Sequence, residues 1–123
     1  MARQYEEAEQ IAVFTWARYQ ECVHPELKWL FHVPNGGARD RVTGAKLKAA
    51  GVKPGVPDIC LPVARGGYHG LYIELKYGKN TTSDSQKEWI THLAEAGYKA
   101  QVCYGRDEAV QAILDYLQEG ESA

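Results

Sequence analysis

Leu71-Tyr72-Ile73-Glu74-Leu75-Lys76 is the stretch that decides the fold of this 123-residue chain. Its residues predict a β-strand, and strand side chains alternate between two faces. Glu74 and Lys76 therefore project together, while Ile73 and Leu75 project to the opposite side. The stretch is otherwise apolar enough to be a central strand, where an acid and a base are costly unless each has a partner or a metal. The same strand thus predicts both a core and a reactive pair.

A second strand is expected directly upstream, from Asp58 to Val63. The turn Arg65-Gly66-Gly67 that follows it is typical of a hairpin. Pro57 extends the chain and lacks an amide donor, so Asp58 falls at the start of this strand. Hairpin pairing then brings Asp58 alongside Glu74 and Lys76.

Helices and further strands are predicted on both sides of the hairpin. Helices are expected at residues 5–21, 43–50 (closed by a left-handed Gly51), 83–96 and from 107 onward, and strands at 29–33 and 98–104. Ser83 and Gln86 form a capping box, and Asp107 is the expected N-cap of the last helix. A strand–helix–strand passage should make a right-handed parallel crossover. The expected fold is α/β, with one mixed central β-sheet flanked by helices in a single domain at 1–123 (core about 5–118).

Charge is distributed unevenly along the chain. The net charge is -2, but residues 39–79 contain eight lysines and arginines and only three acids. This basic middle can form a phosphate-binding surface, although a solvated lysine-rich face would give the same pattern. No apolar run is long enough to cross a membrane and no secretory signal is recognisable, so a cytoplasmic protein without a membrane partner is expected.

Cysteines and aromatic residues are expected to serve mainly in packing. Cys60 and Cys103 lie in apolar stretches, and the three cysteines form no Cys-x-x-Cys pair, which argues against zinc. The large aromatic residues are interpreted as core rather than as base-stacking platforms: Trp16, Trp29, Trp89 and Tyr116.

Two carboxylates on adjacent strands, Asp58 and Glu74, form a hard oxygen site suited to Mg²⁺ or Mn²⁺. Such a metal activates water and polarises a phosphoryl oxygen. A neighbouring lysine, Lys76, can hold or deprotonate the attacking water, or neutralise charge on the phosphate. The residues alone therefore predict metal-assisted hydrolysis.

The pattern Pro57-Asp58 followed by Glu74-Leu75-Lys76 resembles the PD-(D/E)xK nuclease signature. The wider blocks resemble the VRR-NUC branch of that superfamily, in particular its small stand-alone phage and prophage members. These blocks are His32-Val33-Pro34-Asn35-Gly36-Gly37, the segment 51–58, the segment 70–76 and Ser83 to Gln86. The resemblance extends from about Tyr5 to Leu117.

The resemblance implies a DNA endonuclease using Mg²⁺ or Mn²⁺, selective for branched DNA such as Holliday junctions, acting as a homodimer in a host cell. It adds the backbone carbonyl of Leu75 to the metal ligands and Gln86 to the catalytic set. It also implies a first-helix glutamate that faces the metal, four residues before a glutamine. Glu6 with Gln10 fits this spacing and is favoured, with Glu9 as the rival.

Contacts with DNA are expected from the basic middle and the glycine-rich turn. The candidate residues are His32, Asn35, Arg39, Arg41, Lys46 and Lys53. His32 also has a plain structural interpretation, as a strand-end histidine held by a neighbouring carbonyl. The glycines 36 and 37 are equally well explained by an ordinary turn.

Two other functions share these features. A catalytically silent DNA-binding module could keep the fold, but it would gain nothing from buried carboxylates facing phosphate. A restriction-type endonuclease shares the centre but needs sequence-reading elements, for which 123 residues leave little room.

Overall fold

The computed structural model describes residues 2–34 and 41–119, and the side chains of 4–34 and 43–119. Its elements, in chain order, are α1 (Ala2–Gln20), the 3-10 helix η1 (Pro25–Trp29), β1 (Phe31–His32), α2 (Arg41–Ala49), β2 (Ile59–Leu61), β3 (Leu71–Lys76), α3 (Asp84–Glu95), β4 (Lys99–Tyr104) and α4 (Gly105–Gln118). These bounds agree with the predicted order of helices and strands.

The four strands form one mixed sheet in the order β1-β2-β3-β4. The β2–β3 hairpin is antiparallel and pairs Ile59 with Ile73. β3 and β4 are parallel, with Glu74 opposite Val102. The mixed sheet, the hairpin and the parallel crossover through α3 are therefore confirmed. β3 is central, so its polar side chains are covered from both sides.

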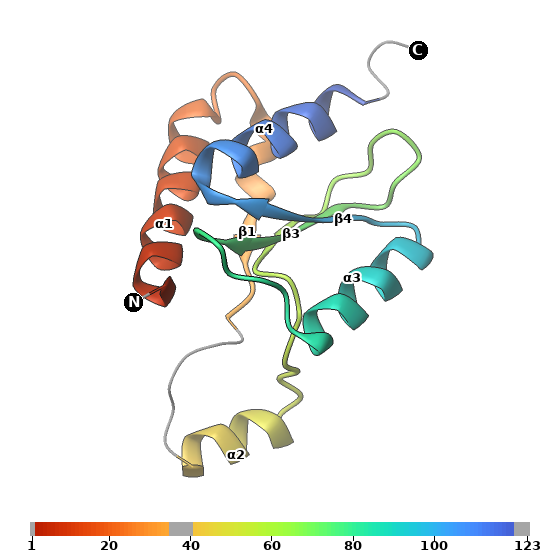
Figure 1. The fold of residues 1–123 in the computed structure, drawn as a ribbon. Coiled ribbons are helices and arrows are strands. Elements are labelled where there is room, and N and C mark those ends of the chain that lie inside the picture. The colour runs from red at the N-terminus through yellow and green to blue at the C-terminus, as the bar shows by residue number, and fades with distance from the viewer. Residues whose placement is uncertain (1, 35–40, 120–123) are drawn as a thin grey trace.

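The helices lie on both faces of this sheet. In Figure 1, α1 and α4 pack together over one face, α3 lies on the other, and α2 stands apart from the sheet. The core fills the space beneath α1 and α4, where Ile73 and Leu75 pack with Val13 and Tyr116. Tyr116 also donates a hydrogen bond from its hydroxyl to the Val63 carbonyl. The opposite face of β3 carries Glu74 and Lys76.

Two predictions about helix ends are confirmed. Ser83 accepts a hydrogen bond from the Gln86 amide, and the Gln86 side chain accepts one from the Ser83 amide, which completes the capping box. Gly51 has φ +107° directly after α2. Glycine is favoured in this left-handed conformation because glycine has no Cβ.

Trp29 departs from its predicted place. The strand expected at 29–33 is reduced to Phe31–His32, because Pro25 starts a 3-10 helix that includes Trp29. Leu27 and Leu30 take the buried positions of this segment, which leaves Trp29 57% exposed. Trp16 packs against the core as predicted, and Tyr116 is fully buried.

The predicted N-cap of the last helix is also wrong. α4 begins at Gly105, before Asp107, and has no side-chain cap from its first flanking residue. Two glutamates serve its first turn instead. Glu108 accepts a hydrogen bond from the Tyr104 amide and Glu9 accepts one from the Arg106 amide. Asp107 forms an ion pair with Arg106. The helix follows β4 without a loop, so the free amides lie further upstream than the sequence suggested.

Cys60 and Cys103 are buried and Cys22 is exposed, as the apolar context of the first two predicted. Within the described residues, no helix is both long and apolar enough to span a membrane.

Candidate active site on the polar face of the central strand

Glu74 and Lys76 are buried on the polar face of β3. Their exposed fractions are 2% and 8%, which makes them the buried charged residues of the described chain. Lys76 Nζ lies 3.7 Å from Glu74 Oε2. Strand alternation places both side chains on the face opposite Ile73 and Leu75, as predicted. A buried acid and base thus stand side by side at the end of the central strand.

Asp58 is held in place through both its side chain and its backbone. Its Oδ2 accepts a hydrogen bond of 2.9 Å from the Leu75 amide, which attaches it to β3. Its backbone carbonyl accepts hydrogen bonds from the Val33 amide and from His32 Nδ1, at 2.7 and 2.9 Å. The residue at the start of β2 is therefore fixed between its two neighbouring strands, beside Glu74.

The two carboxyl groups perturb each other. Burial, together with the Asp58 and Glu6 carboxylates, raises the pKa of Glu74 to about 8, and Lys76 opposes this rise. Burial also raises the pKa of Asp58, against the hydrogen bond from Leu75 and the charges of His32 and Lys76. Two acids that are costly to ionise together are typical of a functional site that gathers positive charge.

Gln86 joins α3 to this pair. Its Nε2 donates a hydrogen bond of 3.1 Å to Glu74 Oε2, while its Oε1 accepts one of 2.8 Å from the Ser83 amide. The two roles that the sequence suggested for this residue, in the capping box and at the centre, are thus served by the two ends of one amide group.

The structure separates the two candidate glutamates of α1. The Glu6 carboxylate lies close enough to Glu74 to raise its pKa, and its Oε2 accepts a hydrogen bond of 2.7 Å from Asn80 Nδ2. Glu9 instead accepts the Arg106 amide at the start of α4. Glu6 therefore lies near the carboxyl pair, whereas Glu9 holds the start of α4.

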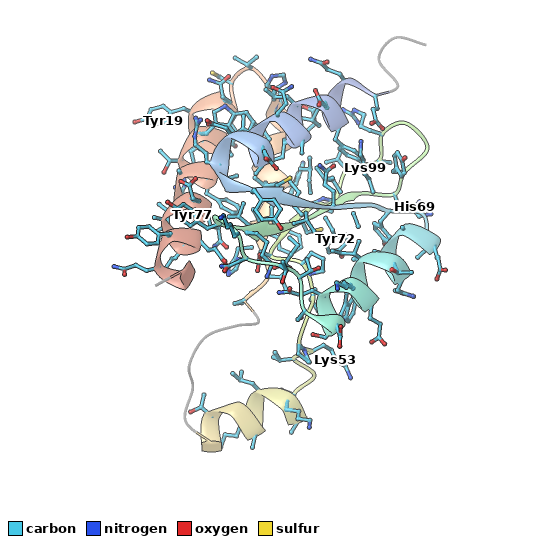
Figure 2. The ribbon with its side chains drawn as sticks, in the orientation of Figure 1. Tyr19, Lys53, His69, Tyr72, Tyr77 and Lys99 are labelled. Carbon is cyan, nitrogen blue, oxygen red and sulfur yellow. The ribbon has the colours of Figure 1, made fainter. Side chains whose placement is uncertain are left out.

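The first turns of α1 are fastened to the end of β3. The rings of Tyr5 and Tyr77 stack with centroids 4.9 Å apart and planes 16° from parallel. Figure 2 shows Tyr77 at the end of the sheet next to α1. Because Tyr5 precedes Glu6 and Tyr77 follows Lys76, this stack fixes the approach of Glu6 to the site.

Asn80 is a member of this neighbourhood that the sequence did not reveal. Besides donating to Glu6, it accepts a hydrogen bond of 2.8 Å from the Tyr104 hydroxyl through its backbone carbonyl. It lies in the loop between β3 and α3, where no periodic pattern distinguishes it. Only the folding of this loop against α1 and β4 brings it to Glu6.

The donor set fits a hard divalent cation. Glu74 Oε1 is buried and has no hydrogen-bond partner in the described structure, beside a second carboxyl group that raises its pKa. A divalent cation would coordinate the unpartnered oxygen and would also offset the repulsion between the two carboxylates. Within the described residues, no three His, Cys, Asp or Glu side chains are grouped for a metal. The remaining ligands would come from a backbone carbonyl such as that of Leu75, water and phosphate, as Mg²⁺ commonly requires.

The predicted DNA contacts are only partly within the described structure. His32 is exposed, and its Nδ1 donates to the Asp58 carbonyl, which leaves Nε2 available at a pocket also lined by Gln10 and Arg18. Lys46 and Lys53 are exposed. Asn35 and Arg39 lie outside the described residues, and so does the side chain of Arg41.

Comparison with known proteins gives two agreeing matches. The family model of the VRR-NUC domain matches residues 3–107. A solved structure named "VRR_NUC domain protein" is 36% identical in sequence and superposes with a TM-score of 0.81, over 94% of this chain and 90% of that chain. No curated protein gives a significant match. The matched span contains every residue of the centre described above.

Proposed function

This chain belongs to the VRR-NUC family of nuclease-type DNA-processing domains, and we propose that it hydrolyses DNA phosphodiester bonds with Mg²⁺ or Mn²⁺. The observation that carries the proposal is the carboxyl pair of half-buried Asp58 and buried Glu74, with Lys76 Nζ 3.7 Å from Glu74. In a module that only binds DNA, these two carboxylates would repel the phosphate groups and weaken binding. A nuclease uses them to gather cations at the scissile bond.

Asp58 and Glu74 would hold the metal together with the Leu75 carbonyl, and Glu6 would face it from α1 and add negative charge. Bound there, Mg²⁺ or Mn²⁺ supplies Lewis-acid stabilisation of the charge that develops on the phosphoryl oxygens. The hydrogen bonds from Leu75 N to Asp58 and from Gln86 to Glu74 fix the two carboxylates before substrate binds. Such preorganisation avoids reorganisation at the moment of reaction.

Lys76 is the residue of the centre that can act directly on the reacting groups. Its ammonium group donates hydrogen bonds, so it can hold the attacking water and neutralise charge on the phosphate. Its 8% exposed fraction means that these interactions take place largely away from bulk water, which strengthens them. The ion pair with Glu74 directs the amine toward the carboxylates.

The surface around the centre supports binding of the DNA backbone. Lys46 on α2 and Lys53 after it are exposed, and α2 projects away from the sheet (Figure 1). His32 is exposed beside Asp58. Lysines that contact phosphates bind DNA without reading its sequence, which suits recognition of DNA shape.

Branched DNA and a homodimer are further parts of this proposal. The described part of one chain carries a single centre of this kind, and symmetric cutting of a four-way junction requires two centres related by a two-fold axis. Exposed apolar side chains on α1 and around the edge strand β1 support self-association: Ile11 is 56% exposed, Trp29 57% and Phe31 46%. Light scattering of the purified protein tests the dimer.

The proposal is tested with a cleavage panel of single-stranded, duplex, flap and four-way-junction DNA, with Mg²⁺, Mn²⁺ or EDTA. We expect metal-dependent cleavage that is strongest on branched DNA. If none of these substrates is cleaved and isothermal titration shows no Mn²⁺ binding, the result favours a silent DNA-binding module instead. Equal cleavage of duplex and junction would support the nuclease activity and contradict the preference for branched DNA.

A further inference from the structure

We propose that a pocket beside α3, lined by Lys53, Glu88, Trp89 and His92, binds an unpaired base of the DNA substrate. The pocket has a volume of about 370 Å³ and opens to the surface. The inference rests on the proposed nuclease function and adds to it a substrate class, namely DNA with an unpaired nucleotide near the cleaved bond.

Trp89 supplies the aromatic surface of this pocket. It is half-buried but lies outside the core cluster, contrary to the core role expected from the sequence. The edge of one ring in the Trp89–His92 pair meets the face of the other, with centroids 6.3 Å apart and planes at 90°. This contact limits the rotation of both rings. A tryptophan held in a pocket is suited to stack on a nucleobase, whatever its identity.

Lys53 and Glu88 complement the polar parts of a nucleotide. The ammonium group can bind phosphate, and the carboxylate can accept a hydrogen bond from an exocyclic amino group such as that of cytosine. Among the residues that the structure describes, neither side chain has a hydrogen bond or ion pair. Figure 2 shows Lys53 on the segment between α2 and the sheet, near the first turn of α3.

Gly55 fixes this segment against α3. A Cβ at Gly55, where φ is +90°, would lie 2.6 Å from the backbone carbon of Ser85 and 2.9 Å from the Gln86 amide nitrogen. Only glycine permits so close an approach. The segment that carries Lys53 is thereby packed onto the helix that carries Trp89, and the pocket has a defined shape.

The two segments that form the pocket also lead to the catalytic centre. Lys53 is five residues before Asp58, and Trp89 is three residues after Gln86, one turn along α3. A nucleotide in the pocket is therefore held at a constant position relative to the carboxylates. In a fully paired duplex the base faces are covered by stacking, so the pocket selects a nucleotide that has left the helix.

The test measures DNA binding by fluorescence anisotropy in a Lys76→Ala background without added metal, so that the probes stay intact. The probes are a duplex with a single-stranded tail, the same duplex with an abasic tail, and a blunt duplex of equal length. We expect Trp89→Ala to reduce the preference for tailed over blunt DNA roughly 5- to 100-fold, from the usual loss of one stacked base. Trp89→Phe should retain most of the preference, and Tyr19→Ala, which truncates a 78% exposed aromatic residue at the end of α1, should retain all of it.

Two results would overturn the inference: an unchanged preference in a folded Trp89→Ala, or an equal affinity of the parent protein for the normal and abasic tails. The second comparison needs no pocket variant, so the inference stays testable even if Trp89→Ala fails to fold. Failure of the proposed function has a different signature, because it appears as absent cleavage by the wild-type protein with Mn²⁺. Lys53→Ala should weaken binding of every probe and reduce its salt dependence, in contrast to Trp89→Ala.

Discussion

The side chain of Gln86 donates a hydrogen bond to Glu74, with 3.1 Å between Nε2 and Oε2, while its other end closes the capping box of α3 with Ser83. One residue thus determines both where a helix begins and how a buried carboxylate is oriented. The helix on the polar face of the sheet is positioned by the same group that orients the candidate metal ligand.

The two roles of Gln86 can be separated by substitution. Gln86→Ala should lower the free energy of unfolding by about 1 kcal/mol through the lost cap and should also reduce cleavage. Gln86→Glu keeps a capping-box acceptor but faces Glu74 with a second carboxylate, so it should retain stability and lose activity. Urea denaturation and junction cleavage measure the two effects. If Gln86→Glu cleaves like the wild type, Gln86 has only the structural role.

Glu6 and Glu9 should respond differently to removal of charge. Glu6→Gln should weaken Mn²⁺ binding in isothermal titration, because a carboxylate near Glu74 is lost while an acceptor for Asn80 remains. Glu9→Gln should leave Mn²⁺ affinity unchanged. Glu9→Ala should destabilise the fold by about 1 kcal/mol, since the Arg106 amide loses its acceptor. If Glu9→Gln weakens Mn²⁺ binding and Glu6→Gln does not, Glu9 is the glutamate that faces the metal.

Lys76→Ala should reduce cleavage of four-way junctions roughly 10²–10⁴-fold, the usual range for a group that assists proton transfer or charge stabilisation. Binding of the junction, measured by anisotropy, should persist, because most affinity for DNA comes from contacts with the phosphate backbone. Lys79→Ala removes an exposed lysine three residues away and is the matched control. Retained metal-dependent cleavage by Lys76→Ala would remove this residue from the mechanism.

The stability of the metal-free protein should fall as pH rises. Burial raises the pKa of Glu74 from 4.5 to about 8, so across this interval the folded state binds more protons than the unfolded state. The free energy of unfolding then decreases with pH, by at most about 1.4 kcal/mol per pH unit for one proton. The decrease ends above the folded pKa. Urea denaturation in EDTA between about pH 5 and about pH 8.5 measures it.

Mn²⁺ should reverse this trend, because the metal takes the place of the proton and binds more tightly as pH rises toward 8. Glu74→Gln should reduce the pH-dependent loss to the part contributed by Asp58 and should weaken its reversal by Mn²⁺. Glu95→Gln changes an exposed glutamate at the end of α3 and should leave both unchanged. A metal-free protein whose stability is constant over the interval would show that the pKa of Glu74 is not raised.

Much of the site was predictable because its determinants are close together in the chain. Alternation along Leu71–Lys76 places Glu74 and Lys76 on one face, and the Pro57-Asp58 pair with the following glycine turn brings Asp58 to them. The capping box of Ser83 and Gln86 is a four-residue pattern. Each follows from backbone geometry over a few residues, so the sequence by itself determined the trio, the hairpin and the parallel crossover.

Tertiary packing decided the remainder. The packing of α1 against α4 and β3 separates Glu6 from Glu9, and the loop after β3 brings Asn80 to Glu6. Trp29 is exposed and Trp89 lines a pocket because other residues occupy the core positions expected for them. Periodicity identifies apolar side chains, but which of them become covered depends on elements that are distant in sequence. Only the folded chain determines those contacts.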